Sequence, residues 1–184
     1  MYFRLFILLI TVLFNAGIAN ADTTQERRVT ISASIFPRII AVDENLREKL
    51  DASGNVRLGL LYRTDKDKAV KLSKLMTRKV SNIAGNTIVF EFIDANNLDK
   101  TKLSALSGLF LVHPLSDKQL DQINEISVRK KILCFSPFEG DVERGVTAGI
   151  FIGAKIRPYF NLNNIKKSRI SLKPALLRVS KTYE

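Results

Sequence analysis

The sequence predicts an α/β domain of three layers, in which a mainly parallel sheet is flanked by helices. Short apolar runs alternate with segments of helical periodicity, at the spacing of βαβ units. Three of the runs are almost continuously apolar, as expected for strands buried on both faces of a parallel sheet. Beyond residue 145 the pattern changes to two β-rich runs and a short helical segment, which predict a hairpin and a terminal helix.

Residues 1–21 have the layout of a secretory signal peptide. Arg4 and the free amino terminus provide positive charge, Leu5–Phe14 is almost entirely apolar, and Ala19-Asn20-Ala21 offers the small-x-small pattern that signal peptidase accepts. The apolar run, about ten residues, is short for a helix that must cross ~30 Å of hydrocarbon. No Cys follows the run, which argues against a lipoprotein. We therefore expect export to the periplasm with cleavage after Ala21.

The rest of the chain is long enough for one domain with its own core. We expect a linker over residues 22–28 and a single domain over residues 29–184. The whole chain carries a formal net charge of +11, spread along its length. A nucleic-acid reader needs cations on one face with aromatic or base-reading side chains between them, and the sequence has no such arrangement. We expect no nucleic-acid partner; the charge favours an anionic surface or an acidic protein, or serves solubility alone.

The first segment of this domain, Val29–Val42, is apolar. Its Phe36-Pro37 pair disfavours helix at Phe36, because a proline restricts the residue before it. Pro37 can itself open a helix over Arg38–Leu50. Ser53-Gly54-Asn55 then predicts a turn.

Val56–Tyr62 predicts the first strand, and Asp67–Ile83 predicts a helix. Apolar residues recur in the helical segment at spacings of three and four, as on a buried helix face. The other face is basic and carries Lys68, Lys71, Lys74, Arg78 and Lys79. A row of cations on a helix is usually a solvated face, and a docking surface is the alternative.

Three further strands are predicted over Asn86–Asp94, Leu109–His113 and Lys131–Ser136. Leu98–Leu106 is expected to form a short helical connection. Ser116 and Gln119 have the spacing of a capping box, which predicts the start of a helix before the last of these strands.

The C-terminal part begins with two β-rich runs, Val146–Ile152 and Lys155–Leu162. Gly153-Ala154 separates them, so the pair predicts a hairpin. Pro174 follows Ser171 and Lys173 and marks the start of a terminal helix.

The sequence contains few residues in the patterns of catalytic or metal-binding sites. Cys134 is the only cysteine, so no disulfide can form within the chain, and its apolar neighbours predict a small buried side chain. One His and one Cys do not suffice for a zinc site. His113 ends the third predicted strand, at a carboxyl end where ligands bind. Its functional interpretation is a ligand contact or general base, and the alternative is a structural histidine. The chain has no nucleophile elbow, zinc-binding helix or phosphate-binding loop, so we expect no enzyme, no cofactor and no metal.

The stretch from Gly108 onward has an order of segments known from a family of exported proteins. A "vLFI" strand comes first, a strand closing on "F-x-I-N-L" comes later, and an "L-x-I-S-x-x-LL" helix is last. The matching segments here are Gly108–Val112, Lys131–Ser136, Arg144–Phe151, Lys155–Leu162 and Arg169–Ser180. On these residues the chain resembles the YfiR family. Ser32–Arg38 departs from the family's aromatic-rich helix, since the chain has no Trp.

The resemblance implies a periplasmic regulator that docks on the sensory domain of an inner-membrane signalling protein, such as a diguanylate cyclase, and holds it inactive. It also implies an α/β sheet flanked by helices and a protein that can form a homodimer. A redox-sensing mechanism does not carry over, because Cys134 is alone.

Two functions follow as hypotheses, neither of them catalytic. The first is this regulator, which uses basic surface residues to bind its partner. After cleavage of the signal peptide it is not stably inserted in the membrane. The second is a periplasmic small-molecule (solute) binding protein, with a crevice near Tyr62, Arg63, His113 and Ser136. The candidate contacts for a ligand or partner are Arg63, Lys71, Lys74, Arg78, His113, Lys166, Lys167 and Arg169.

Overall fold

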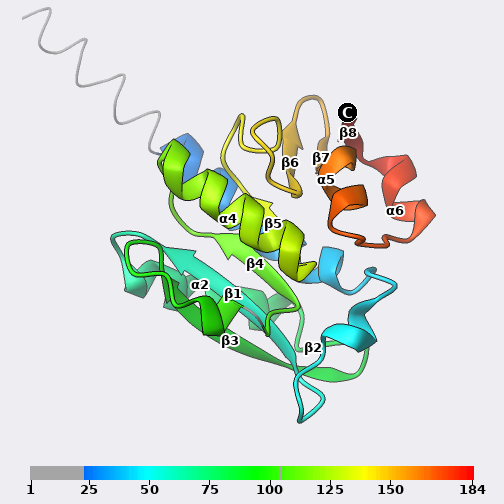
Figure 1. Ribbon diagram of the computed structural model, residues 1–184. Helices are drawn as coiled ribbons and strands as arrows, with labels where there is room; N and C mark the ends of the chain where they lie inside the picture. Colours follow the sequence, from blue (N-terminus) through cyan, green and yellow to red (C-terminus); the bar gives the residue numbers. More distant parts are fainter. Residues whose placement is uncertain (1–22, 104) are drawn as a thin grey trace, which may run out of the picture.

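The computed structural model describes residues 23–103 and 105–184, which form helices on both sides of one sheet (Figure 1). Within these residues the sheet has eight strands in the order β2-β3-β1-β4-β5-β6-β7-β8. The strands are β1 (Val56–Tyr62), β2 (Asn82–Ile83), β3 (Asn86–Asp94), β4 (Gly108–Leu111), β5 (Leu133–Ser136), β6 (Ala148–Ile152), β7 (Ile156–Asn161) and β8 (Lys181–Tyr183).

An unlabelled N-terminal helix covers residues 23–40. The other helices are η1 (Leu46–Lys49), α2 (Lys66–Lys79), α3 (Lys100–Leu103), α4 (Asp117–Lys130), α5 (Leu162–Lys167) and α6 (Pro174–Val179). None of the helices in the described ranges is long and apolar enough to span a membrane. The expected signal peptide and its cleavage after Ala21 lie outside the described residues.

The predicted fold class is confirmed. Strands β3, β1, β4, β5 and β6 pair in parallel, and the sheet continues through the antiparallel β6–β7 hairpin. β7 then pairs in parallel with β8. The carboxyl ends of the central strands therefore meet at one edge of the sheet, with the connecting helices on its faces.

The N-terminal helix differs from what the sequence predicts. Residues 23–28, expected as a linker, are helical, and the helix continues through Phe36-Pro37 to residue 40. The expected helix over Arg38–Leu50 is absent; the short η1 lies there instead. Pro37 interrupts one helical hydrogen bond, but Val29, Ala33, Phe36 and Ile40 all lie on the buried face. Their burial outweighs the local penalty of the proline.

The core has two parts, one on each face of the sheet. On one face the Phe36 ring lies 5.5 Å from that of Phe110 and 5.7 Å from that of Phe135, centroid to centroid. The helix approaches β4 so closely that a Cβ at Gly108 would lie 2.5 Å from Ile40 Cδ1. On the other face α4 buries its apolar residues against the sheet and covers Cys134.

Local signals account for several boundaries. β1 and β3 have the predicted bounds, and the capping box of α4 is present, with the Ser116 and Gln119 side chains each bonded to the other's backbone N–H. The predicted helix over Asp67–Ile83 is too long: α2 ends at Lys79, and β2 forms a hairpin with β3 instead. Ala84 and Gly85, both with positive φ, make the turn.

Candidate functional site

A crevice of about 630 Å³ lies at the carboxyl edge of the sheet, between the N-terminal helix and the loops that follow β4 and β5. Open parallel sheets bind their ligands at this edge, and the volume is in the usual range for small-molecule sites. The lining residues are Thr24, Gln25, Arg28, Pro114, Leu115, Phe138, Glu139, Asp141 and Arg144.

Arg28 is one of the two cations that line this crevice. It is half-buried on the N-terminal helix, and its Nε donates to the Pro137 carbonyl at 3.0 Å. Its Nη2 donates to the Ile150 carbonyl in β6, at 3.4 Å. The guanidinium is therefore tied to the chain after β5 and to β6 through neutral oxygens.

Within the described residues, most of the hydrogen-bonding capacity of Arg28 is unused. A guanidinium carries five N–H donors, and the two carbonyls take two of them. Among the described residues no carboxylate forms an ion pair with Arg28. A positioned guanidinium with free donors is suited to bidentate binding of a carboxylate or phosphate.

The second arginine of the crevice, Arg144, is already paired with acids. Its Nη1 donates to Asp141 Oδ1 at 3.3 Å, and its Nη2 donates to Asp117. Asp141 is buried and also accepts a hydrogen bond from the Ser136 hydroxyl at 2.6 Å. Burial raises the pKa of Asp141, against the lowering effects of Ser136 and Arg144. This group of charges shapes the loop after β5 and leaves Arg28 as the available anion contact.

Two polar side chains behind the crevice are engaged within the fold. The Ser136 hydroxyl donates to the Asp141 carboxylate and not to an imidazole. His113 accepts a hydrogen bond at Nδ1 from the Arg63 backbone N–H, at 3.3 Å. Burial, followed by the charge of Lys68, lowers the pKa of His113. His113 thus joins the ends of β1 and β4 as a neutral acceptor, and the residues that follow it line the crevice.

The structure brings together two of the candidates that the sequence singles out, Arg63 and His113, but separates the others. Lys71, Lys74 and Arg78 are exposed along α2, where they line a shallow groove of about 510 Å³. Lys166 and Lys167 are exposed on α5, and Arg169 follows with a φ of 51°. The role of each in binding stays a prediction.

Arg28 was not among the predicted site residues, because residues 22–28 were expected to form a linker. The only local indication is the helical spacing of Arg28, Ser32 and Phe36. Its bonding partners, 109 and 122 residues away in the chain, cannot be inferred from nearby sequence.

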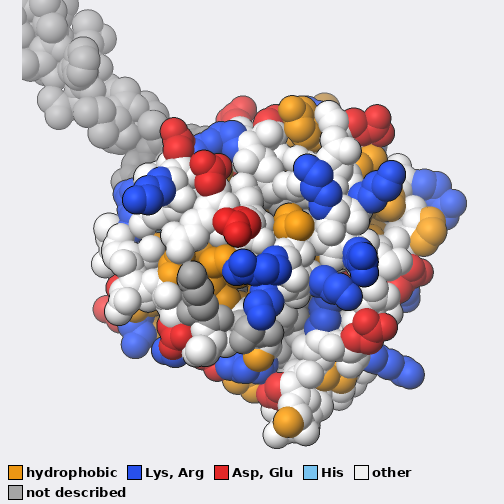
Figure 2. Space-filling view, viewed as in Figure 1, with side chains coloured by type: hydrophobic (Ala, Val, Ile, Leu, Met, Phe, Trp, Pro, Cys, Tyr) orange, Lys and Arg blue, Asp and Glu red, His pale blue; other side chains and the backbone are white. Residues whose placement is uncertain are grey.

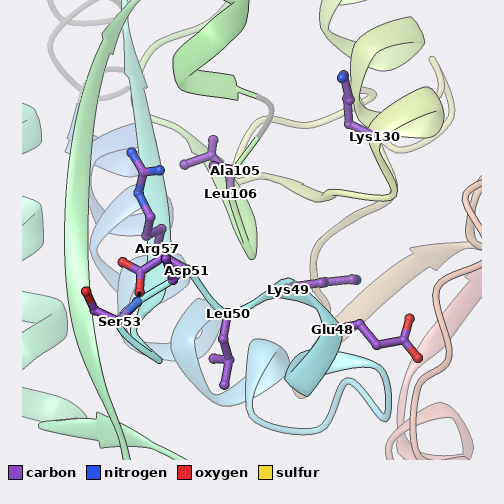
Figure 3. Close-up of a pocket in the computed structure, with 10 residues that line it drawn as sticks. Glu48, Lys49, Leu50, Asp51, Ser53, Arg57, Ala105, Leu106 and Lys130 are labelled. Carbon is purple, nitrogen blue, oxygen red and sulfur yellow. Dashed lines mark hydrogen bonds between the residues drawn. The ribbon is translucent and has the colours of Figure 1, made fainter.

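A second cavity, of about 570 Å³, lies at the opposite end of the sheet (Figure 3). Figure 2 shows Lys and Arg side chains gathered on this side of the molecule, near the end of α4. Two of the cations are neutralised: Lys49 pairs with Asp43 at 2.5 Å, and Arg57 pairs with Glu91 at 2.6 Å. Asp51 accepts backbone hydrogen bonds from Ser53 and Asn55, which lower its pKa. The Lys49–Asp43 pair and the Asp51 hydrogen bonds therefore hold the chain before β1, and the Arg57–Glu91 pair joins β1 to β3.

In the described ranges, no cluster of His, Cys, Asp and Glu side chains is arranged to hold a metal ion. Cys134 is fully buried, and burial raises the pKa of its thiol to about 12. It behaves as the small buried side chain that its neighbours predict.

No family model and no curated protein matches the chain. Its fold is similar to that of solved structures. The ABC domain in complex with L-Trp from Streptococcus pneumonia has a TM-score of 0.53 and 11% identity, over 78% of this chain and 61% of that one. A conserved domain protein from Vibrio cholerae has a TM-score of 0.51 and 14% identity, over 77% of this chain and 60% of that one.

A third structure is the ligand-free, open form of a substrate binding protein with adhesive properties from Clostridium difficile. It has a TM-score of 0.52 and 14% identity, over 77% of this chain and 58% of that one. The chain thus spans about three-fifths of the length of each of these proteins. At these identities the likeness is one of fold.

Proposed function

We propose that this protein binds a small molecule bearing a carboxylate or phosphate, without transforming it, in the crevice at the carboxyl edge of the sheet. The observation that carries the proposal is Arg28: a half-buried guanidinium, fixed by two carbonyls, with three donors unspent and no acidic partner in the described chain. Because this side chain is already held in place, little of its conformational entropy is lost when it binds an anion.

The walls of the crevice suggest the rest of the ligand. Leu115 and Phe138 offer apolar surface beside Arg28. Glu139 is exposed at the same crevice and forms no ion pair within the described residues, so it can accept from a ligand ammonium group. A compact amino acid with an apolar side chain combines these three features.

The comparisons support the same class of function. Of the similar structures, one is described as a complex with L-Trp and another as a substrate binding protein. The expected export of the chain suits a solute-binding role. Solute receptors usually close two lobes around a ligand, whereas this chain has a single sheet in its described residues. We therefore propose an open, one-lobed binding site.

The test is a thermal-shift panel of apolar amino acids, each compared with its carboxamide, which lacks the carboxylate. We expect an acid of the panel to raise the unfolding midpoint in a concentration-dependent way, as a ligand of the native state must. The matching amide has no effect at the same concentration. Arg28→Gln abolishes the shift, and Arg38→Gln, an exposed position on the same helix, preserves it. Equal shifts with acid and amide, or an unchanged shift in Arg28→Gln, contradict the proposal.

A second function, the regulator that the YfiR resemblance implies, is favoured by one observation. Lys71, Lys74 and Arg78 form an exposed row on α2, and none of them forms an ion pair within the described residues. Such a row suits an acidic face on the sensory domain of a membrane protein. Pull-down from solubilised membranes tests it: a sensor protein recovered with the natural chain should be lost when all three are changed to Glu. Recovery of no membrane sensor, or of the same sensor with the triple variant, contradicts this role.

A further inference from the structure

The tip of the β6–β7 hairpin presents two large apolar side chains to solvent. Ile152 is 41% exposed and Ile156 is 46% exposed. The two residues are direct partners in the antiparallel register, so their side chains lie next to each other on one face of the hairpin. Large apolar side chains that gather at the surface often mark an interaction site.

The exposed isoleucines continue into a groove shared with the N-terminal helix. The groove has a volume of about 310 Å³, and no acidic residue in the described part of the chain lines it. Its lining residues are Thr24, Arg27, Arg28, Ile31, Ile152, Gly153 and Ile156. The patch is thus apolar at its centre and cationic along the helix.

Further cations stand on the hairpin itself. Lys155 and Arg157 flank Ile156 and are exposed. Arg27, Lys155 and Arg157 form no ion pairs with other described residues. Lys181, by contrast, is engaged within the fold, because its Nζ lies 4.0 Å from the centre of the Phe151 ring and 4.7 Å from that of Tyr159. The hairpin therefore keeps two cations, Lys155 and Arg157, available beside its apolar tip, and Arg27 on the N-terminal helix provides a third.

We infer that this tip docks on an anionic lipid surface. Isoleucines on a projecting turn can enter the boundary between headgroups and acyl chains, while the neighbouring Lys and Arg contact lipid phosphates. A fluid surface shapes itself around a projecting turn, whereas a protein partner would need a matching hollow. The net charge of +11 attracts the protein to the same surface. Docking of this kind is peripheral and places the crevice at Arg28, which also lines the groove, close to the membrane.

The experiment measures sedimentation of the exported protein with vesicles of phosphatidylglycerol and phosphatidylcholine, and with vesicles of phosphatidylcholine alone, at physiological salt. We expect binding to the anionic vesicles only. The double variant Lys155→Glu/Arg157→Glu should lower the partition coefficient about tenfold or more, and Ile152→Ser/Ile156→Ser should also lower it. All four positions are exposed, and thermal unfolding verifies that each variant is folded.

The matched control is Lys71→Glu/Lys74→Glu, which makes the same change in net charge on α2. It should retain most of the binding. If this control loses as much vesicle binding as the hairpin variants, binding depends on net charge and not on the hairpin, and the inference is wrong. Absence of binding to anionic vesicles, or equal binding to neutral ones, also overturns it. None of these variants changes Arg28, so failure here is distinguishable from failure of the ligand site.

Discussion

Replacing Phe36 by alanine tests whether the N-terminal helix belongs to the core. The ring is fully buried between Phe110 and Phe135. Truncation of a buried Phe to Ala costs about 3–5 kcal/mol, because the transfer free energy is lost and a cavity remains. The cost should lie in that range here, since the aromatic contacts add to the loss and the tight approach of Ile40 to Gly108 leaves little freedom to close the cavity.

The assay is urea unfolding of the natural protein and of Phe36→Ala, with Arg38→Ala as the control. Arg38 is exposed on the same helix, so its variant should stay within about 0.5 kcal/mol of the natural protein. In thermal unfolding the loss corresponds to roughly 2–4 °C per kcal/mol for a domain of this size. A cost below about 1 kcal/mol for Phe36→Ala would refute the packing of this helix and, with it, the positioning of Arg28.

Three further predictions concern ionisable groups. Burial raises the pKa of Asp141, so the protonated side chain stabilises the fold below about pH 4, and this stabilisation is lost as the pH rises through the folded-state pKa. Urea unfolding from acid to neutral pH should show a decline in the free energy of unfolding that is weaker in Asp141→Asn. The same pH dependence in both proteins contradicts this. Burial lowers the pKa of His113, so the neutral side chain stabilises the fold above about pH 6.5, and this stabilisation is lost as the pH falls through the lowered pKa. An NMR titration of His113 should give a midpoint below that of a free histidine. The variant His113→Gln should lose less stability on acidification than the natural protein. Burial raises the pKa of Cys134 to about 12, so a thiol reagent at neutral pH should react only after unfolding; rapid reaction of the native protein would show that the thiol is accessible.

The strands were the most predictable part of this fold. β1 and β3 are apolar runs bounded by turn residues, and their observed bounds are those predicted. The capping box before α4 is a local hydrogen-bond exchange between residues three apart, so it can be identified from the sequence alone. Alternation of such runs with helical segments also predicted the parallel sheet, since parallel strands need crossover connections.

The N-terminal helix and β2 were not predictable by the same reasoning. The local preference of Phe36-Pro37 opposes helix, and burial of the helix face, with Phe36 packed against Phe110 and Phe135 from the middle of the chain, overcomes it. Ile83 continues the apolar spacing of α2, yet the turn at Ala84 and Gly85 pairs β2 with β3. A tertiary contact decided the first case, and a local turn decided the second.

The site was predicted only in its general position. The carboxyl edge of the sheet follows from the parallel topology, and Arg63 and His113 do meet there. Arg28 reaches the same edge from a helix whose first residues were expected to form a linker, and it is held by the carbonyls of Pro137 and Ile150. Backbone carbonyls carry no sequence signature, so this anchor could be found only in the folded chain.

NMR mapping with a ligand from the acid–amide panel tests the central claim most directly, because it reports where the ligand binds. The account predicts that the Arg28 side-chain N–H signals and the backbone amides of residues 24–28, 115 and 138–144 shift together and saturably, with no shift on α2. Saturable shifts confined to the opposite cavity around Lys49 and Arg57, or to α2, would contradict it.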